Sequence, residues 1–420
     1  MVCVLIGLIQ ADRCPAQMLA GVWVDQTQQA IDRERMTDLR VIVLDHSGKP
    51  AHGVPVTVAQ VKSDFQVGVV LPASGWPEHA DPDAEFWRVI NAVSLERMTA
   101  WPTLQPEPGT GLDEDAAWRI EQAINEAEAR GLTIRWGPIV SADPGRVPGW
   151  VLKLDDHELA DAIRRYERLI LERFGRRVHQ VDPYTQTLDH GFLEQRIGLA
   201  VIRELYQLVP TVHDSVLACA RFDDALTPIR AQQMLRQITA MREAFIPVGM
   251  VAIDQRFIGD ADRKVLTRLF ERLGEIRHPV ILSGLSVGGD SELNAAIHLE
   301  TVLRVAMTRP ELRGIYFEAL TDDEAVMPFS ALIDHTGQPT PSGRLVDHLY
   351  HELWRTDQLA YTDELGNVRL RAFPGTYRIE TTLLDGQTLR AHIRLNRSPD
   401  ERIVLLEPLH PSEPMNQSKR

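Results

Sequence analysis

The stretch of sequence from residue 248 to residue 285 decides the fold, because it holds one complete unit of a repeating pattern. Residues 248–254 read VGMVAID and residues 279–285 read PVILSGL, and both short apolar runs predict buried strands. Between them, residues 262–276 read DRKVLTRLFERLGEI, in which apolar side chains recur with the period of an amphipathic helix. This succession predicts parallel strands that are joined by a helical crossover.

The same unit recurs along the chain from Phe65 onward, at a spacing of roughly 35 residues. Eight strands are predicted, at residues 65–71, 92–98, 132–140, 178–184, 215–222, 248–254, 279–285 and 314–320. Helices are predicted at residues 113–130, 157–174, 191–208, 228–245, 262–276, 291–308 and 342–354, and Thr227 and Asp290-Ser291 are expected to cap two of them. Eight such units predict a closed (β/α)8 TIM barrel, with buried strand residues Val181, Val251, Ile253, Ile281 and Ile315.

Predicted strands without helices flank the barrel region at both ends. Residues 39–44 and 54–58 read as a β-hairpin with a turn at residues 46–50. After Trp354, strands are predicted around Tyr361 and at residues 368–372, 377–383, 389–395 and 403–406. Neither end has enough strands to bury a face by itself, so we expect one small all-β sandwich module built from both. Its expected core includes Val41, Val43, Val56, Leu370, Tyr377 and Ile379.

These patterns predict a domain order along the chain. The expected ranges are a leader and helix at 1–37, a sandwich in two parts at 38–62 and 357–408, a barrel at 63–356, and a disordered tail at 409–420. Residues 2–9 form an apolar run as long as the core of a signal peptide, although no Lys or Arg precedes it. This run slightly favours a secreted or periplasmic location, and no integral membrane segment is predicted.

Composition excludes several classes of partner. The 420 residues carry a formal net charge of −14, and no basic stripe is present to bind phosphates, so nucleic acid and anionic membrane surfaces are not expected partners. Neutral ligands and proteins remain. The three cysteines, Cys3, Cys14 and Cys219, are too widely spaced for a disulfide framework or a thiolate metal site, and Cys219 is expected to be buried. The sequence predicts no cofactor and no metal, and indicates no oligomeric state.

Several motifs occur in an order that resembles a known family. They are Asp38-Leu39-Arg40-Val41, Gly48-Lys49-Pro50, Phe65-Gln66-Val67-Gly68, Ala92-Val93-Ser94-Leu95-Glu96 with Trp101, Glu107-Pro108-Gly109, Val147-Pro148-Gly149-Trp150, Gly175-Arg176-Arg177-Val178 and Pro341-Ser342-Gly343-Arg344. Together they cover about residues 30–408 and resemble bacterial members of the family-10 glycoside hydrolases, the xylanases. The resemblance implies the barrel plan of that family and an ancestry in polysaccharide metabolism.

The same resemblance places the two catalytic glutamates of the family at positions that hold no carboxylate here. The acid/base glutamate follows an asparagine at the end of strand four, where this chain reads Thr185-Gln186, and the nucleophilic glutamate falls on Gly284. Retaining hydrolysis needs two carboxyl groups about 5 to 5.5 Å apart. The resemblance therefore implies a pseudoenzyme, a scaffold that binds a carbohydrate or a protein partner.

The positions that bind sugar in the family have changed as well. The resemblance places its asparagine and lysine after strand two on Arg97 and Ala100, its strand-three residues on Gly137, Ser141 and Ala142, and its strand-six glutamine and histidine on Asp254 and Arg256. We therefore expect no subsite for xylose.

Polar residues at the carboxyl ends of the predicted strands are the candidates for lining a cleft. They are Arg97, Trp101, Asp182, Tyr184, Gln186, Arg221, Asp254, Arg256 and Glu318. Asp182 matches a framework aspartate of the family, which implies a structural hydrogen-bonding role. Asp254 and Glu318 define the alternative hypothesis, an active glycosidase that hydrolyses O-glycosyl bonds with a relocated carboxylate pair. Arg256 is the expected ion-pair partner of Asp254.

Three weaker patterns each leave two interpretations open. Asp223-Asp224 could bind a divalent cation or cap the following helix. Gly288-Gly289-Asp290 could present backbone amides to an anion or form a plain loop. His179 and His190 lack metal-ligand spacing and predict no metal site.

Overall fold

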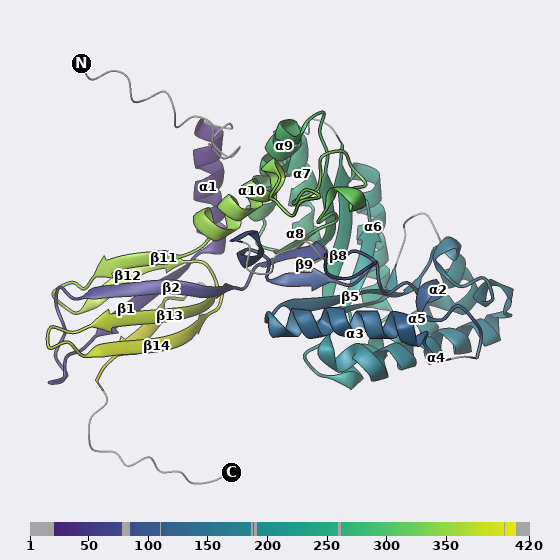
Figure 1. Cartoon of the computed structure of the whole chain (residues 1–420), viewed down its shortest axis with the longest axis horizontal. Coiled ribbons are helices and arrows are strands. Elements are labelled where there is room, and N and C mark those ends of the chain that lie inside the picture. The colour runs from purple at the N-terminus through teal and green to yellow at the C-terminus, as the bar shows by residue number, and fades with distance from the viewer. Residues whose placement is uncertain are drawn as a thin grey trace, which may run out of the picture. The chain divides into compact units, whose positions relative to one another are not determined.

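The computed structural model describes residues 21–77, 85–109, 111–185, 188, 191–258, 262–398 and 400–408 (Figure 1). Within this part, the chain divides into two compact units. One unit comprises residues 21–30 and 66–351, and the other comprises residues 31–65 and 352–408. The apolar run at residues 2–9, Cys3, Cys14 and the predicted tail at 409–420 lie outside the described residues.

The first unit is the predicted TIM barrel. Its eight parallel strands close in the order β10-β3-β4-β5-β6-β7-β8-β9, and the pairing of Ile315 with Val67 joins the last strand to the first. The strands are β3 Gln66–Val70, β4 Ala92–Ser94, β5 Thr133–Ser141, β6 Gln180–Thr185, β7 Leu217–Asp223, β8 Met250–Phe257, β9 Val280–Val287 and β10 Leu312–Phe317. The predicted eight-stranded barrel is therefore confirmed.

Helices alternate with the strands around the outside of the barrel, whereas α1 precedes the first strand of the chain (Figure 1). The α-helices are α1 Val22–Arg35, α2 Trp101–Leu104, α3 Glu114–Ala129, α4 Asp156–Phe174, α5 Phe192–Val212, α6 Pro228–Glu243, α7 Arg263–Glu271, α8 Leu273–Ile276, α9 Glu292–Met307 and α10 Pro341–Asp347. Short 3-10 turns lie at η2 Glu85–Arg88, η3 Pro144–Arg146, η4 Val151–Lys153, η5 Gly175–Arg177 and η6 Asp322–Glu324, and α10 continues as a π-helix, η7 His348–Leu353.

Helix capping agrees with one of the two expected signals. The hydroxyl of Ser291 accepts a hydrogen bond from the Asn294 amide and caps α9. Thr227 precedes α6 but its side chain caps nothing, so that expectation is wrong.

The barrel interior is apolar in its main layers and polar in one of them. All five predicted core residues, Val181, Val251, Ile253, Ile281 and Ile315, are at most 1% exposed, and Cys219 is buried as expected. Tyr316 lies against the bare Cα of Gly68, where a side chain would collide with its ring. Its hydroxyl donates to Gln66 Oε1 at 2.9 Å, so this buried polar group is satisfied.

The second unit is a β-sandwich that both ends of the chain build. One sheet has the order β12-β1-β15 and the other β11-β2-β13-β14. The strands are β1 Thr37–Val43, β2 Pro55–Ser63, β11 Asp357–Tyr361, β12 Asn367–Ala372, β13 Gly375–Thr382, β14 Thr388–Leu395 and β15 Arg402–Leu406. The predicted core residues Val41, Val43, Val56, Tyr377 and Ile379 are fully buried in one cluster, and Leu370 packs against it half-buried.

The predicted hairpin between β1 and β2 is wrong, because the two strands lie in different sheets. The turn itself forms: Asp45 Oδ1 accepts hydrogen bonds from the amides of Ser47 and Lys49, and Gly48 has a φ of 73°. Pairing beyond it stops at a single bridge, between Leu44 and Pro50. Strands in opposite sheets can face their apolar sides toward each other, whereas a two-stranded hairpin would leave one side uncovered.

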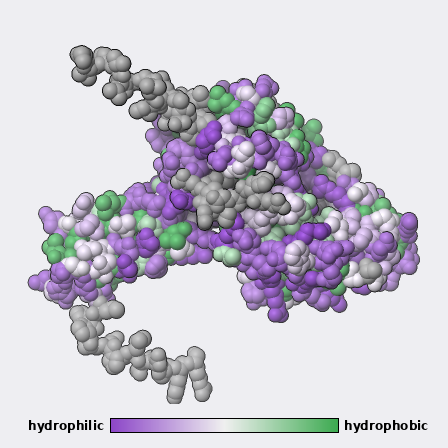
Figure 2. All heavy atoms as spheres, in the orientation of Figure 1, coloured by the Kyte–Doolittle hydropathy of each residue, from purple (hydrophilic) through white to green (hydrophobic). Residues whose placement is uncertain are grey.

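The surface is largely polar. On the face drawn in Figure 2, hydrophilic residues dominate and hydrophobic residues are scattered among them. No helix in the described part of the chain is long and apolar enough to cross a membrane.

Candidate functional site

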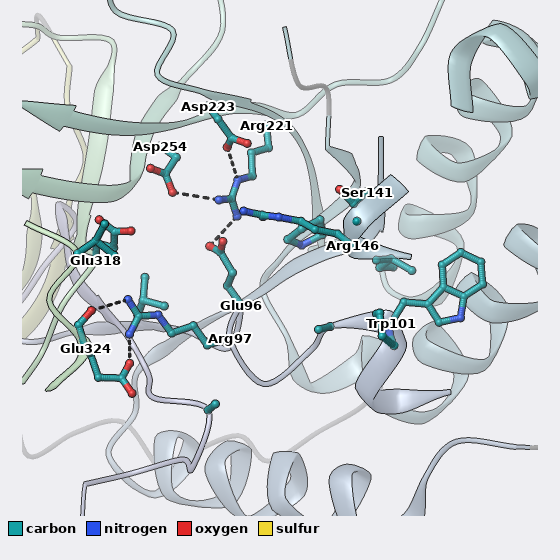
Figure 3. A pocket seen from close by; sticks show the side chains of 18 of the residues that line it. Glu96, Arg97, Trp101, Ser141, Arg146, Arg221, Asp223, Asp254, Glu318 and Glu324 are labelled. Atoms are coloured by element: carbon teal, nitrogen blue, oxygen red, sulfur yellow. Dashed lines mark hydrogen bonds and ion pairs between the residues drawn. The ribbon is translucent and has the colours of Figure 1, made fainter. Parts of the chain in front are cut away.

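A pocket of about 710 Å³ opens at the carboxyl ends of the barrel strands, the end that carries the active site in enzymes of this fold. Half of the residues that line it are charged (Figure 3). The arginines are Arg97, Arg146, Arg221 and Arg256, and the carboxyl groups are Glu96, Asp223, Asp254, Glu318, Asp323 and Glu324. Six carboxyl groups thus face four guanidinium groups.

Arg221 is the centre of this arrangement. Its side chain, which comes from β7, is only 2% exposed and contacts three carboxylates at once (Figure 3). Its Nη1 lies 2.6 Å from Glu96 Oε2, its Nε 3.1 Å from Asp223 Oδ1, and its Nη2 3.0 Å from Asp254 Oδ2. Asp223 and Asp254 are register partners on neighbouring strands, which brings both carboxylates to the same level of the barrel. We call these four residues the Arg221 cluster.

One guanidinium cannot neutralise three carboxylates, so the cluster carries an excess of negative charge at its base. Burial, together with the charges of Glu96, Asp223 and Glu318, raises the pKa of Asp254 to about 8, although Arg221 opposes the shift. Burial also acts to raise the pKa of Glu96, but Arg221 and Arg135 outweigh it and hold that pKa below its usual range. These surroundings therefore favour the ionised form of Glu96 and the protonated form of Asp254.

A second ion pair spans the pocket from β8 to the residue after β10. Arg256 holds Glu318 with two hydrogen bonds, from Nη2 to Oε1 at 2.7 Å and from Nε to Oε2 at 3.3 Å. Both carboxylate oxygens of Glu318 are thus engaged. The hydrogen bond to Glu318 also raises the pKa of Arg256.

The expected ion pair between Arg256 and Asp254 does not form. Asp254 pairs with Arg221 from the adjacent strand, and Arg256 pairs with Glu318 instead. Residues two apart on a strand point to the same face but lie about 7 Å apart, whereas side chains on neighbouring strands approach more closely. Asp254 therefore pairs with Arg221 on the neighbouring strand rather than with Arg256 on its own strand.

The glycines at two positions leave space that the cluster fills. A Cβ atom on Gly284 would lie 2.5 Å from Asp254 Oδ2, because these residues are register partners on β9 and β8. A Cβ atom on Gly137 would lie 2.6 Å from the Cα atom of Glu96. Both carboxylates that flank these glycines, those of Asp254 and Glu96, bind Arg221.

The remaining predicted cleft residues have different positions. Trp101 touches the pocket but is 2% exposed; its ring stacks on Tyr166 with centroids 4.4 Å apart, and its N–H donates to Gln105. Trp101 therefore offers no open face for a sugar ring. Gln186 lies outside the described residues, as does His190.

Asp182 and Tyr184 do not line the pocket, and both are fully buried. Asp182 pairs with Arg135, which is also fully buried. Burial raises the pKa of Asp182 to about 6, while Arg135 opposes the shift.

The Asp223-Asp224 pair and the Gly288-Gly289 pair both bind other groups of the protein. Asp223 binds Arg221, and Asp224 accepts a hydrogen bond from the Arg256 amide at 3.3 Å, so neither caps α6. Gly288 and Gly289 donate their amides to the carbonyls of Phe257 and Pro328. Among the described residues, no group of three or more His, Cys, Asp or Glu could hold a metal ion.

Sequence reasoning missed four charged residues of the pocket. Glu96 follows the apolar run that contains β4, so its position at the end of a strand could have marked it as a candidate for the pocket. Arg146, Asp323 and Glu324 come from the short turns η3 and η6, where no sequence pattern marks a pocket. Glu324 pairs with Arg97, and the nearest carboxylate to Arg146 is Asp143, at 4.0 Å.

Comparison with known proteins finds similarity to an anti-sigma factor and to several xylanases. No protein-family model matches the chain. The anti-sigma-I factor RsgI6 of Acetivibrio thermocellus is 22% identical over 89% of this chain and 49% of its own length, and endo-1,4-beta-xylanase 5 of Arabidopsis thaliana is 19% identical over 80% of this chain and 60% of its own. The chain thus spans about half the length of the curated relatives it matches.

Solved structures give the same result at the level of the fold. Xylanase 10B of Thermotoga petrophila, solved in complex with xylobiose, matches 69% of this chain and 94% of its own with a TM-score of 0.57 and 14% identity. The closed parallel barrel with alternating helices is therefore the TIM barrel fold of the family-10 endoxylanases.

Proposed function

We propose that the barrel is a non-catalytic descendant of a family-10 glycoside hydrolase that binds a carbohydrate in the pocket around Arg221. The observation that carries this proposal is the Arg221 cluster itself. By the resemblance, Gly137 and Gly284 replace a sugar-binding residue and the nucleophile of the family. In this chain Glu96 and Asp254 fill the adjoining space and are held by Arg221.

The state of the remaining carboxyl groups supports a binding role. A nucleophile or general base must present an ionised oxygen with a free lone pair. Glu318 uses both oxygens to bind Arg256, and Asp254 has a raised pKa and binds Arg221. The pocket is nevertheless open and lined with hydrogen-bonding groups, as a sugar site requires.

A binding and hydrolysis screen tests the proposal. The full chain is incubated with xylan, an aryl xylobioside and a panel of other glycans, while binding is measured on the same panel. We expect binding of at least one glycan and no turnover above background. Turnover of the aryl xylobioside by the wild type, abolished by Asp254→Asn or Glu318→Gln, would establish the alternative instead.

That alternative, an active glycosidase with a relocated carboxylate pair, has one observation in its favour. Asp254 places a protonated carboxyl group beside Gly284, in a pocket that Glu318 also lines. A carboxylic acid with a raised pKa is suited to protonate a leaving group. Catalysis would then require Glu318 to be released from Arg256, so Arg256→Gln should increase the rate under this hypothesis and have no effect under ours.

We also propose the domain division into a barrel at residues 63–356 and a sandwich built from residues 38–62 and 357–408. The two compact units support it, with boundaries a few residues away.

A further inference from the structure

The positive and negative groups that line the pocket are unequal in number, and this inequality indicates which kind of ligand the pocket binds. Of the four arginines, Arg97 is paired with Glu324 and Arg256 with Glu318. The fourth, Arg146, lies 4.0 Å from Asp143, and its charge acts on Glu96. Arg221 has to serve Glu96, Asp223 and Asp254 together. Among the described residues, Asp223 and Asp254 therefore have no ion-pair partner other than Arg221.

Asp254 is a carboxyl group of the pocket that has no cation of its own, because it shares Arg221 with Glu96 and Asp223. It is only 7% exposed yet lines the pocket, and its Oδ2 contacts Arg221. Within the described part of the chain, no residue forms a hydrogen bond to its other oxygen, Oδ1. The charged groups that face it are Arg221 and Asp223 from β7, Glu96 after β4, Arg256 on its own strand and Glu318 after β10. Four carboxyl groups thus meet two guanidinium groups.

The charges of the pocket also disfavour recognition of an acidic sugar. The carboxyl groups of the lining outnumber the arginines by six to four, and the whole chain carries a net charge of −14. A field of this sign attracts cations and repels uronates.

We propose that the pocket selects an amino sugar, a carbohydrate whose protonated amine takes the place of the missing positive charge beside Asp254 and Asp223. This inference rests on the proposed function, and it specifies the class of carbohydrate. The ammonium ion brings the second cation that the Arg221 cluster lacks. Asp254 then ionises and releases its proton to the solvent, so each binding event is linked to proton release.

The experiment compares sugars that differ only in charge. Isothermal titration calorimetry of the full chain is performed at about pH 6.5, where both Asp254 and an amine of ordinary basicity are protonated. The ligands are the glucosamine disaccharide, its N,N′-diacetyl form, xylobiose, and a xylobiose that carries glucuronate. Each titration is repeated in two buffers of different ionisation enthalpy, which counts the protons released on binding.

We expect the glucosamine disaccharide to bind about tenfold or more tightly than its acetylated form, with weaker binding at high salt and release of up to one proton. Asp254→Asn should lose both the preference and the proton release. Asp115→Asn is the matched control, since Asp115 is exposed on α3 and the charge change is the same, and it should behave as the wild type.

The outcomes separate this inference from the proposed function. Equal or tighter binding of xylobiose or of the glucuronate sugar would overturn the amino-sugar inference and leave a carbohydrate-binding role intact. Absence of binding by every sugar would overturn both. The proton count on the wild type decides the linkage even if Asp254→Asn fails to fold, because binding of the glucosamine disaccharide without proton release contradicts the assigned role of Asp254.

Discussion

A side chain at position 284 should destabilise the protein, and the structure sets the size of the effect. The Cβ atom of Gly284→Ala would lie 2.5 Å from Asp254 Oδ2 and 3.0 Å from its Cγ. Asp254 cannot swing away freely, because it is buried and its Oδ2 binds Arg221 at 3.0 Å. Overpacking of this kind costs about 1 to 3 kcal/mol. Weakening one of the three contacts of Arg221 adds about 1 kcal/mol.

We therefore expect Gly284→Ala to lower the free energy of unfolding by about 2 to 4 kcal/mol, measured by urea denaturation. Gly111→Ala is the control, because a Cβ at Gly111 meets no atom within 4 Å, and it should change stability by less than about 0.5 kcal/mol. In an Asp254→Ala background, the cost of Gly284→Ala should fall by at least about 1 kcal/mol, since the colliding carboxyl group is gone.

The same collision limits any attempt to restore catalysis. We expect Gly284→Glu, alone or with Gln186→Glu, to show no hydrolysis of an aryl xylobioside above background. A glutamate at 284 must first displace Asp254 and disturb the Arg221 cluster. If Gly284→Ala were as stable as the wild type, or if its cost were unchanged without the Asp254 carboxyl, the steric argument would be refuted.

Three further predictions concern buried charges. The pKa of Asp254 is raised from 3.8 to about 8, so the folded state holds a proton that the unfolded state loses between these pH values. The wild type should therefore lose stability as pH rises through this range, by up to about 1.4 kcal/mol per pH unit. Asp254→Asn should therefore gain stability relative to the wild type from pH 5 to pH 8 in urea denaturation, and a constant difference would contradict the assignment. Arg221→Met leaves three carboxylates without their cation and should cost about 3 to 5 kcal/mol at pH 8. Arg97→Met, whose pair with Glu324 is partly exposed, should cost less than about 1 kcal/mol, and equal losses would show that the cluster is not special. Burial alone raises the pKa of Glu167, so Glu167→Gln should become increasingly stabilising as pH rises above about 4.3. The control Glu172→Gln, at an exposed position of the same helix, should show no such trend, and parallel stability profiles of the two variants would disprove the effect of burial.

The barrel could be predicted from the sequence because its signals are local. Buried strands such as β8 and β9 are continuous apolar runs, and α7 between them has the helical period. These periods depend only on the geometry of each element, so they survive without knowledge of the partner strands. The absence of a carboxylate at Gly284 is likewise a property of the sequence and its resemblance.

Pairing across the fold could not be read in this way. The alternation of Leu39, Val41 and Val43 indicates a strand with one buried face, but it does not say which strand lies beside it. The two N-terminal strands separated into opposite sheets because strands more than 290 residues later supplied their hydrogen-bonding partners, as in the pairing of Ile42 with Asn367.

The ion pairs of the pocket could not be predicted from the sequence either. The sequence shows Arg221, Asp254, Arg256 and Glu318 as polar residues at strand ends, and it determines that they meet at one end of the barrel. Only the tertiary structure decides that Arg221 takes Glu96, Asp223 and Asp254, that Arg256 takes Glu318, and that Asp254 fills the space at Gly284. Ion pairs and pKa values depend on distances of a few ångströms between different strands, and the register of the closed barrel sets those distances.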